Sequence, residues 1–299
     1  MRARSAILLA LFSLPFLVTG CASIDTDSRP WHVVSDTPAG GFAFPESVGC
    51  DSSANVLYVS QFGGTELKPA EKDGKGFISK VGLDGTVIQK RAFDVTLNKP
   101  KGIWIEGLRL WVTDIDSVWI FDTASRRGRK LELPGIQFAN DPAVQRGVLY
   151  VSDNRSDKLF RIEPADFLDE RTPPTVTVAW AGKSVFPNGL WPSRRSGALL
   201  LVGFQSADQP RGIYAMGADG EVKALSAMLG RLDGLHETWD GLIFATDWNS
   251  GSFFQWTAST GVKPLATGFK GPADFCVMND TAYVPDLVQG QVRILKLGR

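Results

Sequence analysis

The chain has 299 residues, with 32 Lys and Arg against 32 Asp and Glu, so its formal net charge at pH 7 is zero. A balanced chain has no overall field to attract nucleic acid, and its one basic cluster, at residues 126–130, is typical of an exposed loop. We therefore expect no nucleic-acid partner.

The N-terminus predicts export and a lipid anchor. Two arginines precede an apolar run at residues 6–18, which is too short to span a bilayer and is typical of a secretory signal. The run leads into Val18-Thr19-Gly20-Cys21, which resembles the lipobox of bacterial lipoproteins. This resemblance implies acylation of Cys21, and the alanine that follows implies the periplasmic face of an outer membrane. Residues 1–20 would be the signal peptide and 21–30 the tether; an ordinary signal peptide with an incidental cysteine is the alternative.

A short phrase then returns six times along the chain. Its copies are Pro45-Glu46-Ser47-Val48, Pro100-Lys101-Gly102-Ile103, Ala139-Asn140-Asp141-Pro142, Pro187-Asn188-Gly189-Leu190, Leu232-Asp233-Gly234-Leu235 and Pro272-Ala273-Asp274-Phe275. The second residues of successive phrases lie 39 to 55 residues apart, and a repeat of about this length built from short strands is the signature of a propeller or a solenoid.

An apolar, strand-forming run follows each phrase and in four repeats ends in aspartate. These residues are Asp114, Asp153, Asp247 and Asp286, which follow the second residue of their phrases by 13 (114−101, 153−140, 286−273) or 14 (247−233) residues. Their constant place at a strand end predicts that they fix the following turn through side-chain hydrogen bonds.

Length selects the architecture. About 270 residues divided among six repeats give about 45 each, the size of a four-stranded blade. We therefore predict an all-β chain in which residues 31–299 form one six-bladed β-propeller domain. The ring should close by pairing of residues 31–34 with the C-terminal blade, because propellers hide their sheet edges.

The second residues of the phrases should meet near the central axis. Five of the six are polar, and polar groups are costly to bury without a partner. Together with the phrases around them, Glu46, Asn140, Asn188 and Asp233 resemble the signature positions of the regucalcin, gluconolactonase and luciferin-regenerating enzyme family. That resemblance implies a six-bladed propeller with one divalent cation held by Glu46, Asn188 and Asp233, and Asn140 as a further pocket residue.

The chemistry of these residues suits a cation. Two carboxylates and one amide oxygen form a hard oxygen set, which favours calcium first and magnesium or manganese as alternatives. Such an ion polarises a lactone carbonyl and acidifies a water, from which Asp233 would take a proton as general base. The alternative is that the axial residues only bond to one another and to trapped water.

Two departures from the family concern the substrate. Phe138 stands where the family usually has an arginine, and Lys101 occupies the second axial position. Lys101 would replace part of the cation's role beside Glu46, bind an anionic substrate, or extend out of the channel as an ordinary rim residue. Sugar-lactone specificity is therefore not carried over.

The remaining cysteines and histidines give weaker signals. Cys50 lies four residues beyond its axial position and Cys276 three, so opposite strand parity predicts two buried free thiols rather than a disulfide. His236 follows Asp233 by three residues; we expect a hydrogen-bonded histidine of the first strand of its blade, with a place in the pocket as the alternative.

Two functions remain. One is a membrane-anchored, divalent-metal-dependent hydrolase of a lactone or small ester. The other is a non-catalytic propeller resembling the NHL-repeat group, which binds a partner protein or a small ligand. Convergence of Glu46, Asn188 and Asp233 on an ion favours the first, whereas Lys101 salt-bridged to Glu46 or Asp233 would block the channel and favour the second.

Overall fold

The computed structural model describes residues 30–171 and 173–299. The predicted signal peptide, Cys21 and all but the last residue of the tether lie outside this part of the chain. Within the described ranges the chain forms strands β1 to β24 and no helix. No described segment is a helix long and apolar enough to cross a membrane.

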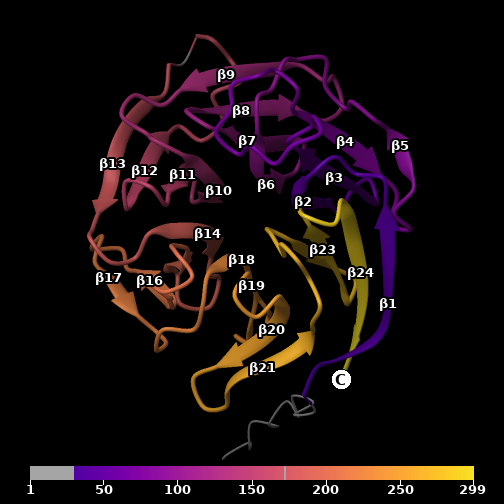
Figure 1. The fold of residues 1–299 in the computed structure, drawn as a ribbon. Coiled ribbons are helices and arrows are strands. Elements are labelled where there is room, and N and C mark those ends of the chain that lie inside the picture. The colour runs from indigo at the N-terminus through magenta and orange to yellow at the C-terminus, as the bar shows by residue number, and fades with distance from the viewer. Residues whose placement is uncertain (1–29, 172) are drawn as a thin grey trace, which may run out of the picture.

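Six four-stranded antiparallel sheets surround a central axis (Figure 1). This confirms the predicted all-β, six-bladed propeller.

The first three blades follow chain order. They are β2 (Pro45–Asp51), β3 (Val56–Gln61), β4 (Phe77–Val81) and β5 (Val87–Gln89); β6 (Pro100–Glu106), β7 (Arg109–Asp114), β8 (Ser117–Asp122) and β9 (Gly128–Glu132); and β10 (Ala139–Gln145), β11 (Val148–Asp153), β12 (Lys158–Glu163) and β13 (Thr175–Ala181).

The other three include the closing blade. They are β14 (Pro187–Pro192), β15 (Leu199–Gly203), β16 (Ile213–Met216) and β17 (Val222–Ala224); β18 (Leu232–Glu237), β19 (Ile243–Asp247), β20 (Ser252–Thr257) and β21 (Gly261–Ala266); and β22 (Cys276–Met278), β23 (Thr281–Asp286), β24 (Gln291–Gly298) and β1 (His32–Gly40).

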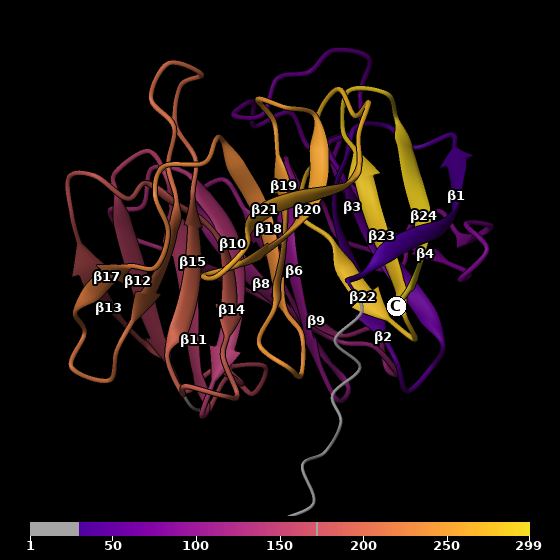
Figure 2. The same ribbon diagram turned by 90° about the horizontal axis from the view of Figure 1, so that it is seen from below.

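The inner strand of the first five blades begins with the repeated phrase, and in the last blade the phrase directly precedes the inner strand β22. In the first five blades the pairing register of the inner strand slips by one residue within the phrase, for example between Pro45 and Ser47 or between Pro187 and Leu190. Such a bulge bends the strand and changes the direction in which a side chain points. Seen from the side, most strands run from one face of the ring toward the other (Figure 2).

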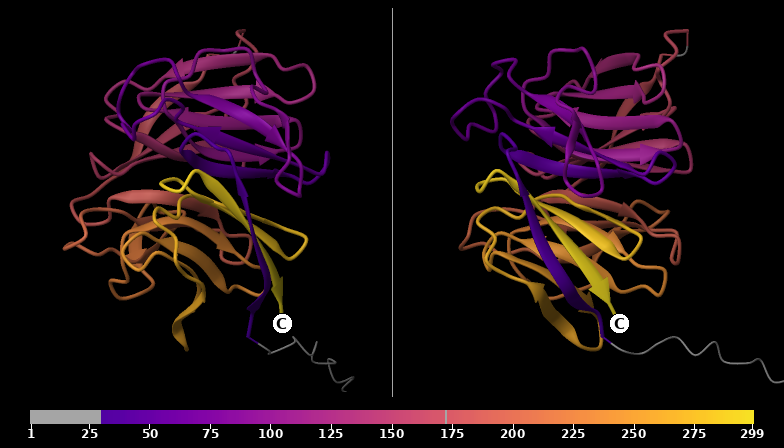
Figure 3. Two further views of the ribbon diagram at one scale, coloured as in Figure 1. Left: turned by 45° about the vertical axis from the view of Figure 1, so that its right-hand side comes forward. Right: turned by 90° about the vertical axis from the view of Figure 1, so that its right-hand side faces the viewer.

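The ring closes where the chain begins and ends. Strand β1 pairs antiparallel with β24 from His32 opposite Gly298 to Gly40 opposite Gln291 (Figure 3). The predicted closure is thus confirmed, and it extends beyond residues 31–34. Apolar clusters between adjacent sheets form the core, as where Phe253 of one blade packs against Phe275 of the next with ring centroids 5.1 Å apart.

A disulfide crosses the same closure. Cys50 and Cys276 are bonded, with their Cα atoms 5.8 Å apart and 226 residues between them in sequence. The prediction of two free thiols was wrong, because strand parity applies within one sheet and these strands belong to two blades. There, Asp274 forms a parallel bridge with Ser47, and the two inner strands meet edge to edge.

In four blades, the aspartate that ends the second strand accepts hydrogen bonds from the backbone just before the phrase. In the last blade, Asp286 accepts hydrogen bonds from the backbone of Lys270 and Gly271, just before the phrase, and of Gln289 in the next turn. Asp153 and Asp247 bond in the same way, whereas Asp114 bonds only the residues before the phrase. The predicted role in the turn is therefore confirmed for three of the four.

Candidate functional site

One cavity at the centre of the ring contains the predicted site residues. The five polar second residues of the phrases, Glu46, Lys101, Asn140, Asn188 and Asp233, all line it. Each is buried, and the cavity has a volume of about 570 Å³. The sixth second residue, Ala273, is buried but does not line the cavity.

Hydroxyl groups of the second strands hold these positions in place. The Ser152 hydroxyl accepts a hydrogen bond from the backbone NH of Asp141 in its own blade and donates one to the carbonyl of Asn188 in the next, at 2.9 and 2.6 Å. Thr246 joins Gly234 to Ala273 in the same manner. Because the backbone groups are paired in this way, the side chains at the second positions are left to face the cavity.

Two of the oxygens proposed as cation ligands have no protein partner. Glu46 Oε2 and Asn188 Oδ1 are buried and accept no hydrogen bond from any residue that the structure describes, and neither does Asn154 Oδ1, which lines the same cavity. Asp233 Oδ2 accepts a hydrogen bond from Trp248 Nε1 at 2.8 Å. Buried oxygens without a partner are costly, and a hard cation is a group that would satisfy them.

The donor set fits such a cation only if amide oxygens take part. No group of three or more His, Cys, Asp and Glu side chains among residues 30–171 and 173–299 is placed to hold a metal. Carboxylate and amide oxygens suit calcium, magnesium or manganese better than zinc or copper.

The acids of the cavity hold their protons strongly. Burial, and then the nearby carboxyl of Asp274, raise the pKa of Asp233 to about 8, against the smaller opposing effects of Trp248 and Arg231. Burial and then Asp233 raise the pKa of Glu46 well above its usual range, although Lys101 opposes this. A divalent cation would reverse these effects by favouring the ionised carboxylates.

Lys101 does not close the channel. Its ammonium donates a hydrogen bond to the carbonyl of Lys99 at 3.1 Å and lies 4.1 Å from the centre of the Phe138 ring. Among the described residues it forms no ion pair with Glu46 or Asp233. Burial lowers its pKa to about 8, the attraction of Glu46 and Asp114 opposes this, and Arg155 lowers it further. The blocked channel that would favour a non-catalytic propeller is therefore not seen.

The aromatic wall of the cavity was not predicted from the sequence. Beside Phe138, four aromatic side chains line the site together with two arginines: Phe62, Phe186, Phe204, Trp248, Arg155 and Arg231. Most of these residues either directly follow the second strand of a blade or lie two residues before the second residue of a phrase. Extending the repeat alignment by these two columns would have found them.

The third residues of the phrases join the blades instead of lining this cavity. Ser47 donates to Asp274 Oδ2 at 2.5 Å and accepts from the backbone NH of Ile103 at 3.1 Å. Across the ring, Asp141 Oδ2 accepts a hydrogen bond from the backbone NH of Leu190 at 2.6 Å. These acids were quoted in the phrases but given no role by the sequence analysis.

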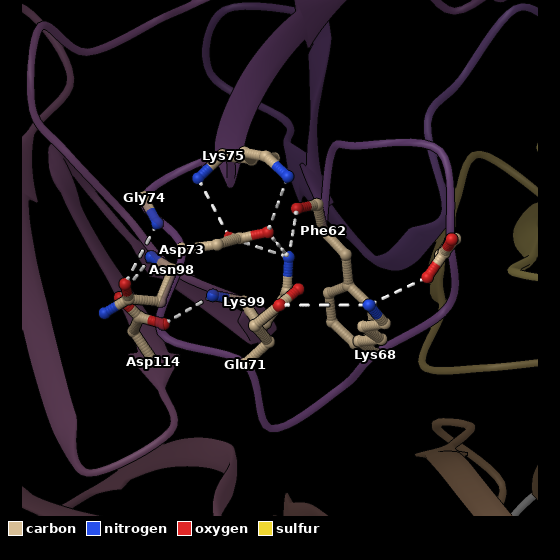
Figure 4. Close-up of polar contacts among 10 residues, drawn as sticks. Phe62, Lys68, Glu71, Asp73, Gly74, Lys75, Asn98, Lys99 and Asp114 are labelled. Atoms are coloured by element: carbon tan, nitrogen blue, oxygen red, sulfur yellow. Dashed lines mark hydrogen bonds and ion pairs between the residues drawn. The ribbon is translucent and has the colours of Figure 1, made fainter.

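A long loop of the first blade, residues 62–76, reaches the cavity. Its Leu67 and Pro69 line the wall, while Asp73 accepts two hydrogen bonds of 2.8 Å from the buried ammonium of Lys99 (Figure 4). The same ammonium donates to the carbonyl of Phe62 at 3.2 Å. The loop is thus tied at both ends to the blade that follows.

His236 lies away from this site. It lines a second cavity of about 140 Å³, where its ring is 4.1 Å from that of Trp191. Its buried Nδ1 has no hydrogen-bond partner, so the prediction of a hydrogen-bonded core histidine was wrong for this atom. Burial lowers its pKa to about 4, which leaves it neutral at pH 7.

Comparisons with known proteins give the fold and no family. The chain matches no family model and no curated protein sequence. Among solved structures it is similar to a catalytically inactive virginiamycin B lyase variant from Staphylococcus aureus solved with quinupristin, at 15% identity and TM-score 0.55, covering 88% of this chain and 99% of that one. A streptogramin B lyase is 14% identical with a TM-score of 0.57, covering 88% of this chain and 98% of that one. A chain of a nidogen–laminin complex is 15% identical with a TM-score of 0.60, covering 70% of this chain and 82% of that one. At this identity the likeness concerns the fold alone.

Proposed function

We propose that the protein is a divalent-cation-dependent hydrolase of a lactone or another small ester, and that the central cavity is its active site. The observation that supports this best is the pair of buried oxygens without a partner, Glu46 Oε2 and Asn188 Oδ1, in the cavity that also contains Asp233. The resemblance of these positions to the gluconolactonase family points the same way. No family model supports it, so the resemblance rests on the phrases themselves.

Glu46, Asn188 and Asp233 are the residues that would hold the cation. When bound, the cation would polarise the ester carbonyl and acidify a water molecule. Asp233 would take the proton of that water as general base. The hydrogen bond from Trp248 orients its carboxylate and leaves the second oxygen available for the proton. Asn140 and Lys101 line the same cavity and would contact the substrate.

Lyase chemistry is not carried over from the structurally similar proteins. The solved variant is described as a histidine-to-alanine form without catalytic activity. This chain has two histidines, His32 in the outer strand β1 and His236 at the second cavity, and neither lines the central cavity. A mechanism that depends on histidine would lack its residue here.

The test is metal binding followed by turnover. Titration calorimetry of the purified protein should detect binding of calcium, magnesium or manganese at millimolar concentration, and a panel of lactones and aryl esters should show cation-dependent hydrolysis. If no cation binds and no panel member is hydrolysed, the hydrolase proposal fails and a non-catalytic propeller that binds a ligand or partner protein becomes the better account.

We further propose that the protein is anchored through Cys21 at the periplasmic face of the outer membrane. The lipobox-like sequence supports this, and the residue itself lies outside the described part of the chain. Cells expressing the protein should incorporate labelled palmitate into it, and Cys21→Ser should abolish the label. A wild-type protein that takes up no palmitate would refute the anchor.

A further inference from the structure

We propose that the substrate carries a carboxylate, which Lys101 and Arg155 bind beside the ring of Phe138, and an apolar body that packs against the aromatic wall of the cavity. This inference rests on the proposed function, because it names the substrate class of the same site. It concerns Lys101 and Arg155 rather than the residues proposed to hold the divalent cation.

Lys101 provides an unusual buried charge. The side chain is 1% exposed, and no described carboxylate lies within ion-pair distance of its ammonium. The ammonium lies 4.1 Å from the ring centre of Phe138 and 5.8 Å from that of Phe62, and both rings line the cavity. A lysine has three N–H donors, and among residues 30–171 and 173–299 one acceptor is found for them, the carbonyl of Lys99. The other donors are available to a ligand.

Arg155 lies over the same ring. Its guanidinium carbon is 4.0 Å from the ring centre of Phe138, and within the described chain the guanidinium makes no hydrogen bond or ion pair. Two cations beside one ring repel each other, and Arg155 is one of the groups that lower the pKa of Lys101. An anion bound between them would relieve that repulsion and accept hydrogen bonds from both.

Charge balance favours an anion. The ionisable groups that line the cavity are three bases and two acids: Lys101, Arg155, Arg231, Glu46 and Asp233. The positive groups remain in excess by one even when both acids are ionised. A carboxylate costs less to desolvate in an aromatic cavity than a doubly charged phosphate does, which makes it the better match.

The remaining wall suits an apolar body. Phe62, Phe186, Phe204 and Trp248 surround the cavity, and Arg231 is held against two of these rings, 4.6 Å from Phe204 and 5.7 Å from Trp248. The cavity volume of about 570 Å³ lies in the usual range of small-molecule sites, about 300–1,000 Å³. A substrate with a carboxylate at one end and an aryl or alkyl body would contact both parts of the wall.

The experiment measures binding without turnover. The ligands are 4-phenylbutyrate and its neutral amide, 4-phenylbutanamide, titrated calorimetrically into the full-length protein with chelator present. The acid should bind at least about tenfold more tightly than the amide, the effect of one to two charge-assisted hydrogen bonds. Lys101→Met should remove most of this preference while keeping a side chain of similar length, and Arg155→Gln, at an exposed position, should reduce it. Lys130→Met, in the outer strand β9 of the same blade, should leave it unchanged.

The outcomes separate this inference from the proposed function. Equal binding of acid and amide, or a full preference in both Lys101→Met and Arg155→Gln, would overturn the carboxylate site even if neutral lactones are hydrolysed. A preference that depends on both residues would support it even if no ester is turned over. Tighter binding of phenyl phosphate than of 4-phenylbutyrate would overturn the choice of a carboxylate.

Discussion

Adjacent residues of the same phrases have opposite roles. Five of the second residues line the cavity, and two of their polar atoms, Glu46 Oε2 and Asn188 Oδ1, have no partner in the described part of the chain. The third residues face the neighbouring blades, and Ser47, Asp141 and Asp274 are all hydrogen-bonded. The polar members of both sets are buried. The comparison teaches that polarity at a repeat position does not identify a site; available, unpaired atoms do.

The other three third residues of the phrases are glycines. A Cβ on Gly102 would lie 2.1 Å from Asp141 Oδ1, and one on Gly234 would lie 2.9 Å from Asp274 Oδ1. Each of these acids therefore needs a glycine beside it in the preceding blade. The carboxyl groups of the acids at the second positions face the cavity instead, and the glycine beside Asp233, Gly189, approaches its backbone carbonyl oxygen.

The largest expected effect is on turnover at a second position. Asp233→Asn removes a charged ligand and the proposed base, so hydrolysis should fall by about 10²–10⁴-fold. The free energy of unfolding should change little, because the substitution is isosteric. Ester hydrolysis assays and denaturant unfolding of the same preparation measure both quantities.

Glu46→Gln is the graded control for that variant. It should weaken cation affinity but retain some turnover at saturating cation, because the proposed base is still present. If Asp233→Asn and Glu46→Gln lose turnover equally at saturating cation, Asp233 is not the base.

The second prediction concerns the disulfide of the closure. Replacing both Cys50 and Cys276 by alanine should lower the free energy of unfolding by about 2–4 kcal/mol, because the bond joins the first and last blades. Cation affinity should be unchanged, since both cysteines line the smaller cavity rather than the central one. Denaturant unfolding measures the stability and cation titration measures the affinity. An unchanged free energy of unfolding would contradict the view that the disulfide stabilises the ring closure.

The third prediction tests the close packing of the third positions. A Cβ on Gly189 would lie 2.2 Å from the backbone carbonyl oxygen of Asp233, so Gly189→Ala should destabilise the fold by about 1–3 kcal/mol. Gly40→Ala is the control, because no atom lies within 4 Å of that Cβ, and it should stay within about 0.5 kcal/mol of the wild type. Equal stability of the two variants in denaturant unfolding would refute the packing argument.

The fold and the axial residues could be predicted because the repeat carries them. A constant interval from Asn140 to Asp153 and from Ala273 to Asp286 specifies the strand pairs, and the blade length specifies the number of blades. The disulfide could not be predicted in this way. It joins inner strands of two blades, and their mutual orientation comes from ring closure rather than from either strand.

The lining of the site was predicted only in part. Phe138 stands where the family usually has an arginine. The structure nevertheless places an arginine over the Phe138 ring, and this residue, Arg155, comes from the turn after β11. When the positively charged side chain comes from another loop, the aligned position itself gives no sign of it. His236 shows the converse, because proximity to Asp233 in sequence did not bring it into the same cavity.

The smallest expected effect is a pH dependence that belongs to the third positions. Burial raises the pKa of Asp274 to about 7, although the hydrogen bonds from Ser47 and from the Phe275 backbone oppose the shift. An unfolded aspartate titrates near ~3.9. Between these values the folded state binds more protons than the unfolded state, so the stability of the cation-free protein should fall as pH rises from about 4 to about 7. Thermal unfolding in chelator should show this decline in Tm, about 2–4 °C for each kcal/mol lost. Asp274→Asn should make the slope shallower, since Asn does not titrate, while Asp141 and the cavity acids keep part of it. A slope of the opposite sign, or one that Asp274→Asn leaves unaltered, would show that Asp274 is ionised in the folded protein.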